Sequence, residues 1–179
     1  MTTDAAQSAA RWLHLAGWAE RQATFAAFMI LVAVLFADVL SRELTGAGLL
    51  WARQLGVYAN LVVAMLGLGV ASASGAHFRP RFADDWLPAR WEPWLVRLQE
   101  ALMAAFCIGF ALVAAIAVAE TRALHERSSL PSWPVWPFQA VIPLAFLSAG
   151  VRHALLARWP RLRPAGRLPA AADPVAGDP

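Results

Sequence analysis

An unbroken apolar stretch, Ala101 to Ala119, constrains this chain more than any other feature of the sequence. It lies between Glu100 and Glu120, and its most polar residue is Cys107. A helix in a water-soluble bundle needs a polar stripe along one side, and this segment has none. At about 1.5 Å of rise per residue it is also long enough to cross a hydrocarbon core of about 30 Å. The stretch therefore predicts a membrane-spanning helix.

Three further segments have a similar character. Residues 23–40 are interrupted only by Asp38, and residues 54–76 carry no charge. Residues 128–151 are uncharged but rich in proline, so we expect a regular helix to begin after the first prolines and to kink at Pro143. The first segment is too long for a signal-peptide core and lacks a small-residue cleavage site, which favours an uncleaved helix.

These segments predict an all-α integral membrane protein with four transmembrane helices. The expected spans are about residues 23–42, 51–76, 98–121 and 135–157, with a cytoplasmic N-terminal segment at 1–22 and a disordered cytoplasmic tail at 158–179. The composition agrees, because 59% of the residues are apolar and 15% are charged, against about 25% charged in a soluble domain. The single Cys excludes a disulfide framework and any site built from several Cys ligands.

The positive charges predict the orientation. All 15 basic residues are Arg, and most of them flank the spans on the side that holds the N-terminus. The opposite side has only Arg42, Arg53, Arg122 and Arg127. Short cytoplasmic loops retain Arg, so both termini are expected in the cytoplasm. The dispersal of the Arg residues along membrane boundaries argues against nucleic-acid binding, despite the pI of about 10.4.

The connection between the second and third spans is rich in aromatic residues. Trp86, Trp91 and Trp94 follow Phe78 and Phe82 at roughly helical spacing, with charged residues between them. Such a stripe favours a helix lying flat in the membrane interface, where Trp keeps its ring in the apolar zone and its N–H in water. Prolines interrupt it, so we predict a short amphipathic interfacial helix over about residues 81–92.

Few polar residues lie at membrane depth, and they suggest no catalytic group. Asp38 and Arg42 stand four residues apart and are expected to neutralise each other. Asn60 has no ionisable neighbour in its span, which favours a hydrogen bond between helices over ion binding. We predict no enzyme activity, no catalytic or metal-binding residues and no cofactor. A self-assembling channel with Asp38 or Asn60 lining its pore is an alternative.

Two histidines support another alternative. His77 and His153 both fall at the predicted cytoplasmic ends of spans, as in a bis-His haem site of a four-helix membrane anchor in a respiratory complex. Both stand beside Arg residues at a boundary, where a His more often contacts headgroups or loops. Small residues also repeat at intervals of four, which predicts close helix packing: Gly67, Ala71 and Gly75, and Ala101, Ala105 and Gly109.

The loops resemble those of a known family. Arg42 closes the first span, Trp51 opens the second, and Gly75, His77 and Arg79 follow it. This arrangement, together with the proline-rich entry to the last span, is similar to the small membrane subunit of tripartite ATP-independent periplasmic (TRAP) transporters, over roughly residues 20–157. One departure is that Arg53 and Gln54 stand where the family commonly has an acidic pair.

The resemblance implies a function and a set of partners. It implies a non-catalytic small permease subunit that supports a large elevator-type subunit in sodium-coupled uptake of an organic acid or similar solute. A periplasmic substrate-binding protein would deliver the solute to the assembled complex. The candidate contacts with partner or lipid are Arg42, Trp51, Arg53, His77, Arg79, Trp86, Trp91 and Trp94.

Overall fold

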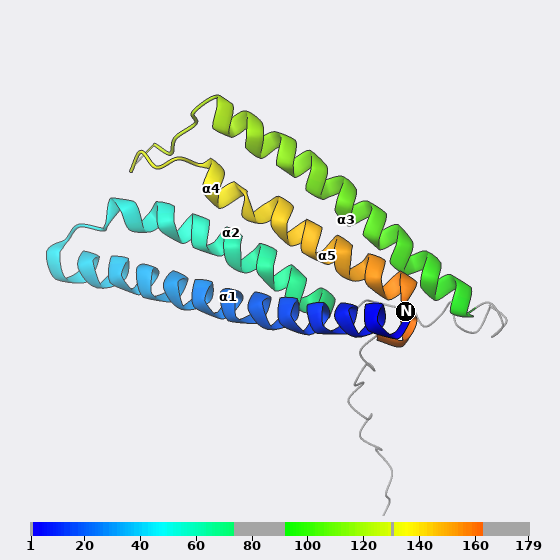
Figure 1. Ribbon diagram of the computed structural model, residues 1–179. Helices are drawn as coiled ribbons and strands as arrows, with labels where there is room; N and C mark the ends of the chain where they lie inside the picture. The colour runs from blue at the N-terminus through cyan, green and yellow to red at the C-terminus, as the bar shows by residue number, and fades with distance from the viewer. Residues whose placement is uncertain (1, 74–91, 130, 163–179) are drawn as a thin grey trace, which may run out of the picture.

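The computed structural model describes residues 2–73, 92–129 and 131–162 and is helical through most of them (Figure 1). The helices are α1 (Thr2–Thr45), α2 (Leu50–Ala73), α3 (Glu92–Ala123), the single turn α4 (Trp136–Gln139) and α5 (Val141–Arg158), followed by a 3-10 turn at Pro160–Leu162. Four helices, counting α4 and α5 as one, are long and apolar enough to cross a membrane. The prediction of an all-α membrane protein is therefore confirmed, whereas the predicted interfacial helix lies almost wholly outside the described residues.

Helix α1 is much longer than a membrane span. It has 44 residues, or about 66 Å at 1.5 Å per residue, against a hydrocarbon core of about 30 Å. The residues assigned from sequence to an N-terminal segment therefore continue the first helix without a break. At its other end α1 stops at Thr45, because Gly46 adopts a positive φ of 73° and donates its N–H to the Arg42 carbonyl.

The last span is interrupted where proline predicts it. Helix α4 begins at Trp136, and Ala140 separates it from α5. Pro143 has no N–H with which to continue the helical hydrogen bonds of the preceding turn. The Leu144 N–H reaches the Ala140 carbonyl at a long 3.4 Å. The break sits one turn before Pro143, as the loss of this donor requires.

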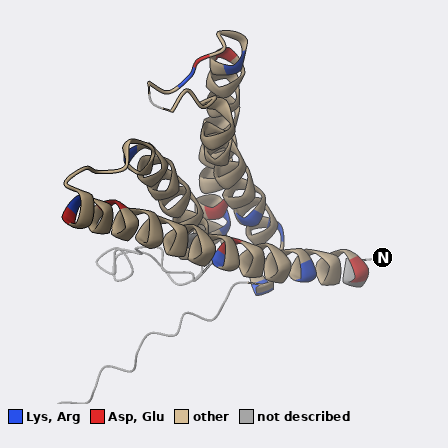
Figure 2. Cartoon of the chain, turned by 90° about the vertical axis from the view of Figure 1, so that its left-hand side faces the viewer, with Lys and Arg blue, Asp and Glu red and all other residues tan. Residues whose placement is uncertain are grey.

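The helices form two antiparallel pairs. Helix α1 packs along α2, and α3 packs along α5, with α2 and α5 in contact between them (Figure 1). Figure 2 shows that the two pairs are inclined to each other. Away from the N-terminus, the Tyr58 ring of α2 stacks on the Phe138 ring of α4, with centroids 4.0 Å apart and planes 6° from parallel. The outer helices α1 and α3 therefore keep most of their circumference uncovered.

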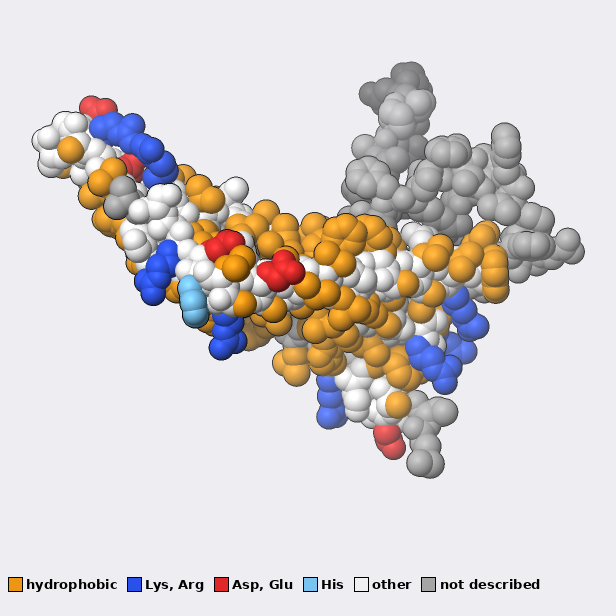
Figure 3. Space-filling view, turned by 90° about the horizontal axis from the view of Figure 1, so that it is seen from above, with side chains coloured by type: hydrophobic (Ala, Val, Ile, Leu, Met, Phe, Trp, Pro, Cys, Tyr) orange, Lys and Arg blue, Asp and Glu red, His pale blue; other side chains and the backbone are white. Residues whose placement is uncertain are grey.

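The contacts between helices use small residues. The apolar residues buried between helices are mostly alanines: Ala9, Ala27, Ala52, Ala59, Ala104, Ala111, Ala145 and Ala149. At the closest approach of α3 and α5, a Cβ atom on Gly150 would stand 2.8 Å from Ile108 Cγ1. Bulky apolar side chains lie outside instead, and they cover much of the face seen in Figure 3. This distribution is the reverse of a soluble core.

The predicted small-residue repeats do not account for this packing. A Cβ atom on Gly67 or Gly109 would meet nothing within 4 Å. By contrast, one on Gly56 would lie 3.1 Å from Leu35 of α1. Gly67 and Gly109 thus do not lie at the contacts between the described helices, and Gly75 lies outside the described residues.

Candidate functional site: a buried charge cluster

Arg152 of α5 joins three helices through buried polar contacts. Its Nη2 lies 2.5 Å from Glu20 Oε2 of α1, and its Nη1 donates to the Gly69 carbonyl of α2 at 2.6 Å. The Ser148 hydroxyl, one turn earlier on α5, donates to the other Glu20 oxygen. The Arg152 and Glu20 side chains are only 3% and 10% exposed. The two charges are thus removed from solvent together and satisfy each other.

The next residue of α5 makes the connection to the fourth helix. His153 Nδ1 lies 2.6 Å from Glu100 Oε2 of α3, and both side chains are almost completely buried. His153 is also the largest fully buried side chain among the described residues. Because residues 152 and 153 point to different sides of α5, two consecutive side chains attach it to α1, α2 and α3. We call Glu20, Gly69, Glu100, Ser148, Arg152 and His153 the buried charge cluster.

Glycine at position 69 is required by this geometry. A Cβ atom there would lie 2.9 Å from the Glu20 carboxylate carbon and 3.0 Å from its Oε2. The backbone of α2 can therefore approach the carboxylate closely enough for the Gly69 carbonyl to share Arg152. A larger residue would meet the end of the Glu20 side chain, so the carboxylate would have to move from its position beside Arg152.

The cluster lies at one edge of the apolar zone. Along α1, Glu20 and Asp38 are about 27 Å apart at 1.5 Å of rise per residue. On α3, Glu100 and Glu120 enclose the uncharged stretch and are about 30 Å apart by the same measure. Both separations match the thickness of a hydrocarbon core. The described helices thus have a Glu20 level and an Asp38 level, and Figure 2 shows the charged patch where α1 meets the other helices.

The Asp38 level is organised around the turn between α1 and α2. Asp38 pairs with Arg42 at 2.8 Å, which confirms the predicted neutralisation. Its other oxygen accepts the Leu49 N–H at 2.6 Å, immediately before α2 begins. A carboxylate at this position caps the helix and interacts favourably with its dipole. A cavity of about 250 Å³ borders this pair and Arg53.

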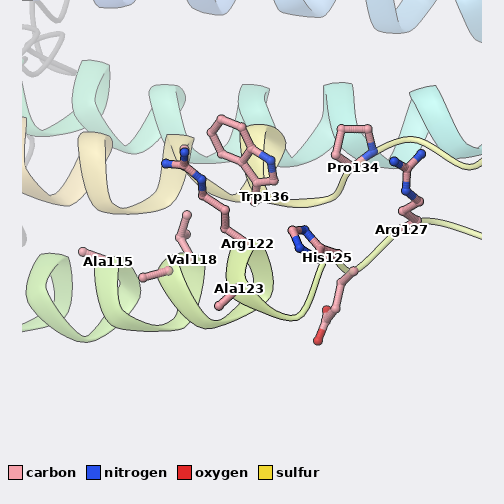
Figure 4. Close-up of a pocket in the computed structure, with 11 residues that line it drawn as sticks. Ala115, Val118, Arg122, Ala123, His125, Arg127, Pro134 and Trp136 are labelled. Atoms are coloured by element: carbon pink, nitrogen blue, oxygen red, sulfur yellow. The ribbon is translucent and has the colours of Figure 1, made fainter.

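A larger cavity of about 820 Å³ lies at the same end of the molecule, between the end of α3 and the start of α4 (Figure 4). The Arg122 guanidinium lies 5.2 Å from the Trp136 ring centroid. Arg127 donates to the Ser132 carbonyl at 3.1 Å. His125, two residues after the end of α3, has a positive φ of 49°. The loop side of the cavity therefore carries charges of both signs, Glu126 and Arg127, and alanines of α3 line the other side.

The comparisons with known proteins agree with this architecture. The family model for the DctQ component of tripartite ATP-independent periplasmic transporters matches residues 31–162. The chain belongs to this family. It is thus a TRAP transporter small subunit and a multi-pass membrane protein. No curated protein and no solved structure matches it.

Four of the eight candidate contact residues of this DctQ chain lie within the described residues. Trp51, Arg53 and Trp94 are exposed near helix ends, and Arg42 is exposed beside Asp38. The remaining four candidates lie outside the described residues: His77, Arg79, Trp86 and Trp91. The proposed contacts of all eight with partner or lipid stay predictions.

The buried charge cluster itself was missed by sequence reasoning. The prediction that His153 is a boundary residue in contact with headgroups or a loop is wrong, because its side chain is buried against Glu100. Arg152 counts only among the Arg residues that predict the orientation, and no role is predicted for Glu20 from the sequence. The sequence does contain a signal for the cluster. Two acids, Glu20 and Glu100, and two adjacent basic residues, Arg152 and His153, fall at the same end of the apolar zone on three different spans.

Membership in the DctQ family gives no support to the haem-anchor alternative. Of the two histidines that it requires, His153 directs Nδ1 to a carboxylate, and His77 lies outside the described residues. Among the described residues, no group of three or more His, Cys, Asp or Glu side chains could hold a metal ion.

Proposed function

We propose that this chain is the non-catalytic scaffold subunit of a TRAP transporter that takes up an organic acid or a similar solute by sodium symport. In this proposal a large elevator-type permease subunit carries the solute and sodium sites, and a periplasmic binding protein delivers the solute. The complex lies in the bacterial inner membrane, and both termini of this chain are cytoplasmic, in line with the distribution of its Arg residues.

The main support for this proposal is that charged side chains at the edges of the apolar zone are paired with one another. Glu20 is matched by Arg152, Glu100 by His153, and Asp38 by Arg42. A subunit that moves an ion or a proton needs ionisable groups that change partner during transport. Here the Glu20–Arg152 and Glu100–His153 pairs connect different helices, and the Asp38–Arg42 pair lies within α1. Such paired side chains are suited to keeping the arrangement of the helices fixed while the large permease subunit moves.

The outer surface supports the same role. Bulky side chains such as Phe28, Phe36, Phe106 and Leu112 are about half or more exposed, while alanines fill the helix contacts. An apolar surface of this extent needs lipid or another membrane protein to cover it. A small subunit built in this way widens the membrane-embedded frame of a larger transporter.

Reconstitution tests the proposal. The chain is co-expressed with the large permease encoded beside it, purified through a tag on that permease, and placed in liposomes with an inward sodium gradient. Uptake of a panel of radiolabelled mono- and dicarboxylates is measured after addition of the associated binding protein. We expect uptake with all three components and none with this chain alone. Uptake by the chain alone, or its failure to co-purify with the permease, would contradict the proposal.

A further inference from the structure

Asn60 is a polar side chain exposed at the middle of a membrane span. It lies on α2 about 10 Å from the level of Arg53 and about 14 Å from the level of Gly69, at 1.5 Å of rise per residue. Arg53 borders the same cavity as Asp38 and Arg42, whereas Gly69 belongs to the buried charge cluster. Asn60 therefore lies near the centre of the apolar zone and faces away from the other described helices.

The amide of Asn60 needs a partner that this part of the chain does not supply. Its side chain makes no hydrogen bond to any described residue. Hydrocarbon offers neither donors nor acceptors, so an amide left there loses the hydrogen bonds that it would make in water. Polar residues in this position typically hydrogen-bond across an interface between transmembrane helices.

The face around Asn60 is continuous, and no described helix covers it. Its exposed residues follow one another at intervals of four, three, four and four along α2: Arg53, Val57, Asn60, Ala64 and Leu68. This spacing forms a single seam along a helix. The opposite residues are already used, since Ala52 and Ala59 are buried and Gly56 contacts Leu35 of α1. We call the five exposed residues the Asn60 face.

The charge of Arg53 on this face disfavours a second copy of the chain as its partner. A second copy of the chain has the same orientation in the membrane, so a twofold contact through the Asn60 face would set Arg53 beside its own equivalent. Like charges placed together oppose such a contact. Arg53 makes no ion pair with any described residue. A partner helix with a polar group at mid-membrane and an acid at the level of Arg53 would satisfy both residues.

We infer that the Asn60 face is the surface of this chain on which a transmembrane helix of the large permease subunit packs, with Asn60 hydrogen-bonded to that helix. This inference rests on the proposed function. The uncovered faces of α1 and α3 display bulky apolar side chains such as Phe36 and Phe106 at membrane depth, and those faces are suited to lipid. The Asn60 face carries the polar side chain at mid-membrane.

Co-purification of variants with the tagged permease tests the inference. Asn60→Leu removes the hydrogen bond but suits lipid, so its insertion is unaffected. Association should weaken about 3- to 30-fold, the range for one hydrogen bond between membrane helices. Ala64→Trp should reduce recovery further by blocking close approach. Ala105→Trp is the matched control, because Ala105 is a small, exposed residue of the α3 span, and it should leave recovery unchanged.

The outcomes separate this inference from the proposed function. Each variant is first shown, as a fluorescent fusion expressed alone, to insert and to run as a single species. If the wild-type chain associates with the permease and Asn60→Leu and Ala64→Trp are recovered equally well, the inference is overturned and the proposed function is unaffected. Equal loss in Ala64→Trp and Ala105→Trp also overturns it, as does a dimer of the chain alone that Asn60→Leu dissociates. Failure of the wild-type chain to associate contradicts the proposed function instead.

Discussion

Removal of Arg152 should destabilise the chain through the charge that it leaves behind. In Arg152→Met the methylene part of the side chain is kept, but the Glu20 carboxylate, itself buried, loses its counter-ion. Removal of one partner of a buried ion pair lowers the free energy of unfolding by about 3–5 kcal/mol. The Gly69 carbonyl also loses its donor. We therefore expect a loss of about 4 kcal/mol, or roughly a thousandfold in the folding equilibrium.

The size of the effect can be measured by unfolding the protein with SDS in mixed micelles. The nine Trp residues provide an intrinsic fluorescence signal. Arg158→Met is the matched control, because it removes an exposed Arg from the same helix and should change stability by no more than about 0.5 kcal/mol. The double variant Glu20→Leu/Arg152→Met removes both charges and should recover most of the loss, since apolar replacement of a whole buried pair is often nearly neutral.

Two results would refute this reasoning. If Arg152→Met is no more destabilising than Arg158→Met, the buried pair does not hold the helices together. If the double variant loses the sum of the two single effects, Glu20 and Arg152 act independently, and the loss reflects packing rather than an unpaired charge.

The other predictions concern the remaining contacts between helices and use the same unfolding assay. His153→Leu should cost about 1–3 kcal/mol, because the buried Glu100 carboxylate loses a hydrogen-bond partner; an unchanged midpoint would contradict the assignment. Gly150→Ala should cost about 1–3 kcal/mol by overpacking against α3, whereas Gly67→Ala, which faces open space, should be neutral or slightly stabilising. Asp38→Ala should cost about 1 kcal/mol as a lost helix cap; equal stability to wild type would show that the cap is dispensable.

Local information was sufficient for the membrane class and for several details. The uncharged stretch between Glu100 and Glu120 has no polar side that could face water, and no tertiary arrangement can supply one. Pro143 removes a donor from its own helix, so the interruption before it follows from sequence. Asp38 and Arg42 are one turn apart on one helix, so their pairing needs no knowledge of neighbouring helices.

The buried charge cluster depended on tertiary structure. Glu20 and Arg152 are far apart in the chain, and their contact exists only because α5 lies beside both α1 and α2. The same holds for His153, which looked like a boundary residue until α3 was placed against it. Hydropathy acts on each helix separately and determines which segments enter the bilayer. Which helices then become neighbours depends on side-chain shape and charge matching between segments, and that information appears only once the helices are packed.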